Sequence, residues 1–83
     1  MNEKKEEVPC MMPLNGVAIG RYAEVNDIQG SERICKKIME MGLNKGMVIQ
    51  MVRNDEGPLI IKIGETRLAL GRGMAQKVIV KEV

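Results

Sequence analysis

The stretch from Ser31 to Val52 constrains the fold of this chain more than any other part of it. Its first half, SERICKKIMEM, has apolar residues at helical spacing, and its second half leads through a glycine-containing turn into a β-rich run. Ser31 is a residue type that caps the start of a helix, and Gly42 is the type that ends one in a left-handed conformation. We therefore predict a short helix, a tight turn and a strand. Because so short a helix is unstable alone, it must pack on the rest of the chain.

The predicted helix has two faces. At about 100° per residue, the apolar side chains fall on one arc, which comprises Ile34, Cys35, Ile38, Met39 and Met41. The charged side chains fall on the opposite arc, which comprises Arg33, Lys36, Lys37 and Glu40. Leu43, just beyond the glycine, lies where a Schellman ending places its apolar contact. The apolar arc is expected to cover the core.

The rest of the chain predicts short strands separated by turn residues. The strand-like runs alternate in polarity or are rich in β-branched residues, and they are residues 20–28, 47–53, 59–63, 67–70 and 78–83. Residues 71–75 contain two glycines and are expected to form a short 3₁₀ turn. With no crossover helices, this pattern predicts a mainly β protein. We expect a small, partly open SH3-like antiparallel β-barrel of about five strands, with one short α-helix after the first strand.

A chain of 83 residues holds one domain at most. Residues 1–11, which begin with a charged run, are predicted to be a disordered N-terminal tail. Residues 12–83 are predicted to form the domain. No apolar run is long enough to span a bilayer, and no secretory signal precedes the chain. The sequence therefore predicts a cytoplasmic protein that is not itself a membrane protein.

Composition argues against several functional classes. The chain has no histidine, so neither a nucleophile–base pair of the usual kind nor a structural zinc site can be assembled, and an enzyme is not expected. No cofactor is expected. A net charge of +2 and a single aromatic residue, Tyr22, argue against nucleic-acid binding, which usually combines a basic face with aromatic stacking.

The sulfur-containing residues admit two interpretations. Cys10 and Cys35 are expected to be free thiols. The Cys10-Met11-Met12 cluster has the soft donors that suit Cu(I), although a short apolar arm packed on the barrel is the favoured interpretation. The remaining methionines are expected to fill the core in place of Phe and Trp, especially Met39, Met41, Met47 and Met51.

The carboxylates do not predict an iron site. Asp27, Asp55 and Glu56 lie in predicted loops, where adjacent acids are typical of a solvated turn. Hard oxygen ligands combined with imidazole would suit Fe(II), but imidazole is missing. We therefore expect weak or no Fe(II) affinity in the isolated domain, and no metal-binding residues are assigned.

Four elements, taken together, resemble the FeoA family of bacterial ferrous iron transport. Met39–Gly46 resembles that family's "LGL-x-x-G" element, with Asn44 where proline is frequent. The other three follow in the family's order and spacing, and they are residues 57–64, residues 67–75 with the "LAL … A" pattern, and residues 77–80. The resemblance covers roughly residues 12–83.

This resemblance implies an SH3-like cytoplasmic domain that acts with the large membrane permease FeoB and has no chemistry of its own. Such a protein would lie at the membrane only through its partner. The fold is also similar to the C-terminal domain of iron- and manganese-dependent repressors. We place the candidate partner contact on the charged helix face and the following turn, at Arg33, Lys36, Lys37, Glu40, Leu43, Asn44 and Lys45.

Other interpretations stay open at this point. The basic helix face is often no more than a solvated surface. An apolar patch of Met and Leu at the helix end would also suit weak homo-oligomerisation. The alternative functions are a small nucleic-acid-binding β-barrel, despite the charge and composition, and a soft-metal carrier that holds Cu(I) with Cys10 and methionines.

Overall fold

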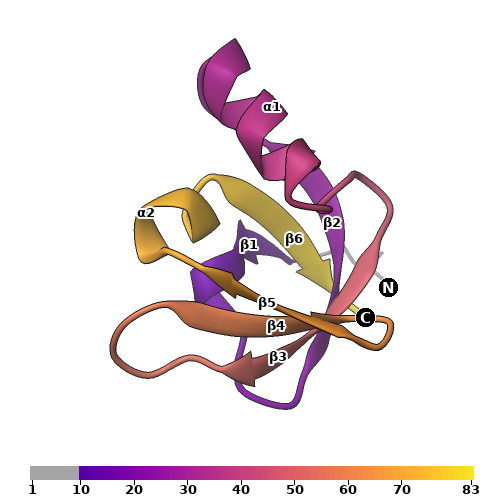
Figure 1. The fold of residues 1–83 in the computed structure, drawn as a ribbon. Helices are drawn as coiled ribbons and strands as arrows, with labels where there is room; N and C mark the ends of the chain where they lie inside the picture. The colour runs from indigo at the N-terminus through magenta and orange to yellow at the C-terminus, as the bar shows by residue number, and fades with distance from the viewer. Residues whose placement is uncertain (1–9) are drawn as a thin grey trace, which may run out of the picture.

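The computed structural model describes residues 10–83 and shows one antiparallel sheet of six strands with a helix after the second (Figure 1). In order along the chain the elements are β1 (Met11–Pro13), the 3₁₀ helix η1 (Leu14–Gly16), β2 (Tyr22–Ile28), α1 (Glu32–Glu40), β3 (Val48–Arg53), β4 (Leu59–Ile63), β5 (Thr66–Leu70), α2 (Arg72–Ala75) and β6 (Val78–Glu82). The strand order in the sheet is β1-β6-β2-β3-β4-β5. The predicted mainly β, SH3-like class is confirmed, with one strand more than the five expected.

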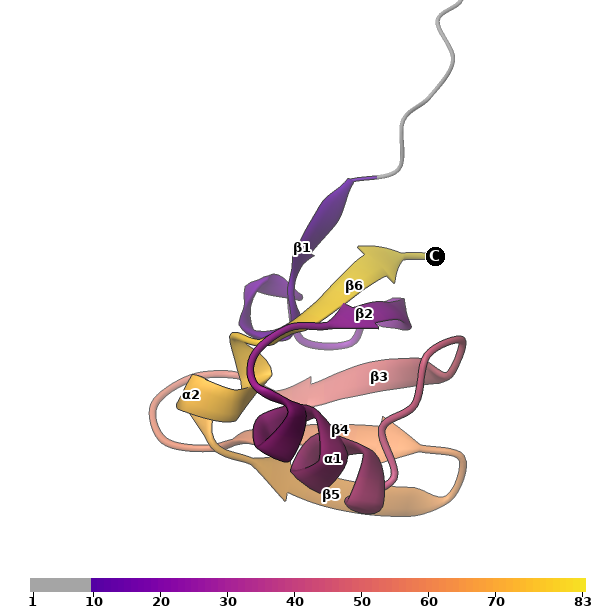
Figure 2. The ribbon, with the colours of Figure 1, turned by 90° about the horizontal axis from the view of Figure 1, so that it is seen from above.

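The sheet curls around a single apolar core. Figure 2 shows β1, β6 and β2 on one side and β3, β4 and β5 on the other, with α2 across the end between β5 and β6. Alternation in the central strands sends every second side chain inward, as expected. The fully buried strand residues include Ala23, Val25, Ile49, Met51, Leu59 and Ile61. No polar or charged side chain is buried among residues 10–83.

The additional strand is β1, which pairs with β6 at one edge of the sheet. Met11 lies opposite Lys81, and Pro13 lies opposite Ile79. Proline is tolerated there because an edge strand needs hydrogen bonds on one side only. A strand of three residues is too short to show a period of two, which is why the sequence pattern did not reveal it. The disordered tail predicted for residues 1–11 falls mainly on residues 1–9, which lie outside the described residues, and Met11 belongs to β1.

The 3₁₀ turn predicted for residues 71–75 is wrong, because this segment is one turn of α-helix. The amide of Ala75 donates to the carbonyl of Gly71 at 2.9 Å, and that of Gln76 donates to Arg72 at 3.0 Å. Both bonds join residues four apart, which defines an α-turn. Gly71 is the N-cap, where glycine is tolerated, and only Gly73 lies within the helix. Ala75 is fully buried, so tertiary packing outweighs the low helix propensity of Gly73.

Helix α1 begins and ends as its sequence predicts. The Ser31 side chain accepts a hydrogen bond from the amide of Ile34 at 3.3 Å, which caps the first turn. At the other end, Gly42 has a φ of +107°. The amide of Gly42 donates to the Met39 carbonyl and that of Leu43 donates to the Ile38 carbonyl, the two bonds of a Schellman motif. The helix therefore ends at a glycine with a left-handed backbone conformation, held by these two hydrogen bonds.

Helix α1 stands away from the barrel rather than lying along it (Figure 1). Only Ile38 of its nine residues is fully buried, together with Leu43 just after it. Ile34, Cys35 and Met41 are half-buried. The expectation that the whole apolar arc covers the core therefore holds for one side of that arc only.

Candidate functional site

The charged face of α1 is an exposed part of the predicted contact site. Arg33, Lys36, Lys37 and Glu40 are all exposed and lie on the side of the helix opposite Ile38. We call these four residues the α1 surface. Within residues 10–83 none of the four forms an ion pair. Three cations and one carboxylate thus face solvent together.

The turn after the helix supplies the other predicted contact residues, with one exception. Asn44 and Lys45 are exposed, and the Lys45 ammonium lies 3.5 Å from a carboxylate oxygen of Asp27. The amide of Gly46 donates to the carbonyl of Val25 at 2.8 Å, which holds the turn against β2. Leu43 is fully buried and anchors the helix end. We therefore leave Leu43 out of any contact surface.

Helix α1 also has an apolar edge that faces solvent. A shallow hollow beside the α1 surface is lined by Glu32, Arg33, Cys35, Lys36 and Met39. Met39 is 44% exposed, so its predicted place in the core is wrong, whereas Met51 is fully buried as expected. Met41 and Met47 are half-buried. Met39 is exposed because α1 stands off the sheet.

The candidate metal ligands are dispersed. Cys10 is exposed, while Cys35 is half-buried and its thiol donates to the Ile28 carbonyl at 3.4 Å. Asp55 pairs with Arg53 at 3.4 Å. Among residues 10–83 no three His, Cys, Asp or Glu side chains gather closely enough to hold a metal ion. In the same part of the chain no helix is long and apolar enough to cross a membrane.

A polar cluster that the sequence pattern did not reveal joins three distant segments. The Asn54 amide donates to the carbonyls of Asn15 at 3.0 Å and Val17 at 2.8 Å. Its oxygen accepts from the Arg72 guanidinium at 3.0 Å, and Arg72 also donates to the Asp55 carbonyl. This cluster ties η1 and the β3–β4 loop to α2. Its half-buried position indicates a structural role.

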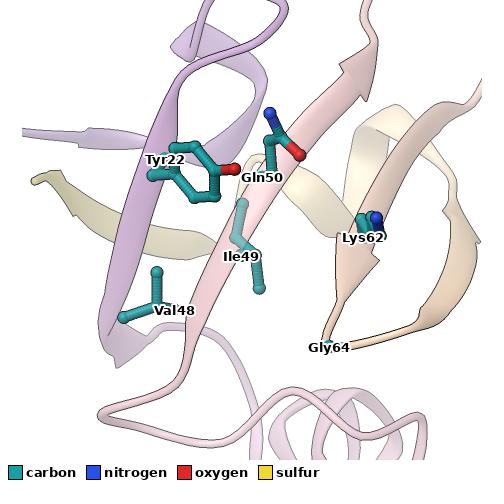
Figure 3. Close-up of a pocket in the computed structure, with 6 residues that line it drawn as sticks. All are labelled: Tyr22, Val48, Ile49, Gln50, Lys62 and Gly64. Atoms are coloured by element: carbon teal, nitrogen blue, oxygen red, sulfur yellow. The ribbon is translucent and has the colours of Figure 1, made fainter.

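A second hollow lies on the outer face of the sheet (Figure 3). Side chains from three adjacent strands line it, namely Tyr22 from β2, Val48 and Gln50 from β3 and Lys62 from β4, with Ile49 and Gly64 completing the wall. Tyr22 is 50% exposed and Val48 is 49% exposed. No local sequence pattern singles these residues out, and only the register brings them together.

The family model that describes the FeoA domain matches residues 12–82. The chain belongs to the FeoA family. It is 32% identical over 72 residues to a protein of Methanocaldococcus jannaschii to which the name Fe(2+) transport protein A has been assigned, and the match spans 87% of this chain and 88% of that relative. The family is a non-catalytic accessory family associated with ferrous iron transport.

Solved structures show the same fold. A crystal structure of an iron uptake regulatory protein, FeoA, superposes with a TM-score of 0.82 at 34% identity, covering 89% of this chain and 99% of that one. A manganese-dependent transcriptional repressor superposes with a TM-score of 0.81 at 16% identity, over 93% of this chain but only 44% of the repressor. At that identity the repressor shares the fold alone. The FeoA resemblance seen in the sequence is confirmed.

Proposed function

We propose that this FeoA-family protein is a cytoplasmic accessory of ferrous iron uptake that regulates a FeoB-type permease by direct contact. The observation that carries the proposal is the α1 surface, which stands off the barrel with three cations and no ion pair within the described residues. Family membership supplies the link to ferrous iron transport. The contact would be made with a cytoplasmic domain of the permease.

The electrostatics of the α1 surface favour an acidic partner. Arg33, Lys36 and Lys37 lie within two turns of helix, so a carboxylate-rich surface would relieve their mutual repulsion. Asn44 and Lys45 extend the surface along the turn, although Lys45 is already paired with Asp27. Complementary charges of this kind mainly raise the association rate, and their effect falls as salt is added.

The rigid base of α1 suits a docking element. The Ser31 cap and the Schellman ending fix both ends of the helix, and Ile38 and Leu43 anchor it in the core. A partner that binds the exposed face therefore meets a preformed helix and loses little conformational freedom on binding.

The test is a binding measurement with the cytoplasmic domain of the FeoB permease encoded in the same genome. Reversing two charges in a Lys36→Glu, Lys37→Glu variant should weaken binding by about tenfold or more, which corresponds to roughly 1.4 kcal/mol. Biolayer interferometry at low and moderate salt would measure it. Unchanged affinity in this variant would overturn the proposal.

A matched control carries the same change of charge elsewhere. The Lys62→Glu, Arg67→Glu variant reverses two exposed cations on the outer face of the sheet, away from α1. It should bind the permease domain as the wild type does. Equal weakening in both variants would show that net charge rather than the α1 surface governs binding, and would remove the assignment to α1.

A further inference from the structure

Four residues on four neighbouring strands form one continuous row across the outer face of the sheet. The register places Tyr22 opposite Gln50, Gln50 opposite Lys62, and Lys62 opposite Arg67. We call these four residues the outer-face row. Directly opposite residues on neighbouring strands have side chains on the same face of the sheet, within reach of one another. Figure 3 shows the first three beside the hollow.

The Lys62–Arg67 end of this row carries unbalanced charge. Like charges directly opposite each other destabilise a sheet. Neither residue forms an ion pair with any residue in 10–83. On the same face, by contrast, Lys81 of β6 lies opposite Glu24 of β2 and pairs with it. Unlike Lys81, Lys62 and Arg67 therefore have no carboxylate partner on this face within residues 10–83.

The opposite end of the row is apolar. Tyr22 is the only aromatic residue of the chain, and half of it faces solvent beside the exposed Val48. Gly64 leaves the hollow open, since an added Cβ there would meet no atom within 4 Å. The Gln50 amide between the two ends donates to the Gly20 carbonyl at 3.2 Å and is thereby held in place. The row thus has an aromatic and a β-branched side chain at one end and two cations at the other, with Gln50 between them.

We propose that the outer-face row, with Val48, binds a short acidic segment of a partner protein. The segment would place an apolar side chain on Tyr22 and Val48 and a neighbouring Asp or Glu on Lys62 and Arg67. A guanidinium binds a carboxylate through two parallel hydrogen bonds, which gives the contact its direction. This surface is separate from the α1 surface, and the inference does not rest on the proposed permease contact.

The chemistry of this face favours a peptide over a polyanion. Binding a nucleic acid or an anionic membrane draws on many phosphate contacts, and the row offers two cations only. Glu24 lies two residues after Tyr22 on the same face of β2 and would repel a long run of phosphates. One or two carboxylates next to an apolar side chain match the charge that is present.

The experiment is an NMR titration of the uniformly ¹⁵N-labelled full chain with a synthetic peptide, acetyl-Gly-Glu-Leu-Glu-Glu-Gly-amide. We expect saturable shifts of the amides of Tyr22, Gln50, Lys62 and Arg67. A peptide with Lys in place of each Glu should cause none, and one with Gly in place of Leu should bind more weakly. The Lys62→Glu, Arg67→Glu variant should lose about tenfold or more in affinity.

The matched control is the Lys36→Glu, Lys37→Glu variant, which should bind the peptide as the wild type does. The Tyr22→Ala variant should bind the peptide more weakly. Its α1 amide resonances should stay at their wild-type positions, which would show that the fold is intact. No saturation at millimolar peptide, or shifts confined to α1, would overturn the inference. The inference would also be overturned if phosphatidylserine vesicles or single-stranded DNA bound to the outer-face row more tightly than the peptide does.

One further outcome concerns the chain itself, whose residues 6–8 read Glu-Glu-Val. If a Glu6→Lys, Glu7→Lys variant without added peptide already shifts the amides of the outer-face row, that segment is the occupant, and the assignment to a partner protein is overturned. Because none of these readouts uses the permease, failure here leaves the proposed function standing, and failure of the permease test leaves this inference standing.

Discussion

Lys62 and Arg67 show how a single cross-strand pair can work against stability. They lie directly opposite each other on β4 and β5, both exposed and without an ion pair among the described residues. Nothing in the packing of the sheet requires two cations there. They should lower the stability of the sheet, because like charges directly opposite each other are destabilising.

A double-mutant cycle measures this cost. The single variants Lys62→Glu and Arg67→Glu each create an opposite-charge pair and should raise the free energy of unfolding by roughly 0.5 kcal/mol. The double variant exchanges two cations for two anions, so it should return close to the wild-type value. Urea unfolding followed by far-UV circular dichroism provides the measurement, and a cycle without coupling would contradict the expectation.

Asn54 marks the limit of sequence-based reasoning at the residue scale. Next to Asp55-Glu56-Gly57 it looks like an ordinary turn residue, and the turn is indeed there. Its three hydrogen bonds, however, reach residues 15, 17 and 72, which only the folded chain brings together. Tyr22 is similar, since only the strand register places it in line with Lys62. Local sequence patterns cannot predict contacts between residues that are far apart in the chain.

At the scale of elements, α1 is the part that the sequence described best. The cap at Ser31, the left-handed Gly42 and the apolar contact of Leu43 all depend on neighbours within a few residues, and these three predictions are confirmed. The burial of Leu43 contradicts its other predicted role as a partner contact. The sequence did not predict strand β1, because three residues are too few to show the alternation of polar and apolar side chains that marks a strand. The α-turn of α2 was missed because the burial of Ala75 overrides the low helix propensity of Gly73. How far α1 stands off the barrel, and hence the exposure of Met39, is a tertiary property.

Two glycine-to-alanine substitutions should act in opposite directions. Gly42→Ala forces a side chain into a φ of +107° and should lower the free energy of unfolding by about 1 kcal/mol. Gly73→Ala, within α2, meets no atom within 4 Å and needs no positive φ, so it should raise stability by about 0.5–1 kcal/mol. Thermal and urea unfolding of both variants would test this, and equal effects of one sign would contradict it.

At the scale of the whole molecule, the described residues form a small apolar core with charge distributed over its exterior. No acid, cysteine or histidine cluster suited to a metal ion occurs among residues 10–83. The surfaces instead fall into two types, a charged helix face and a mixed aromatic and cationic sheet face. For each of these surfaces we propose contact with another protein.

Fe(II) titration tests this description of the molecule. Asp27 lies in β2 rather than in the predicted loop, and Asp55 and Glu56 lie between β3 and β4. Because no three acids gather among residues 10–83 and imidazole is missing, the full chain should bind Fe(II) weakly or not at all. Anaerobic isothermal calorimetry would measure the heat of binding, with Mn(II) as a comparison ion of similar ligand preference. Tight one-to-one binding of Fe(II) would contradict the prediction.

The exposed position of Tyr22 decides what optical methods can observe in this protein. With no tryptophan in the chain, all intrinsic ultraviolet emission comes from one phenol on the surface. Its fluorescence should therefore change little when the core melts and strongly when something covers the outer face. The intensity of tyrosine emission would then report, without a label, whether a ligand covers the outer face. Unfolding of the core would have to be followed by a backbone signal such as far-UV circular dichroism.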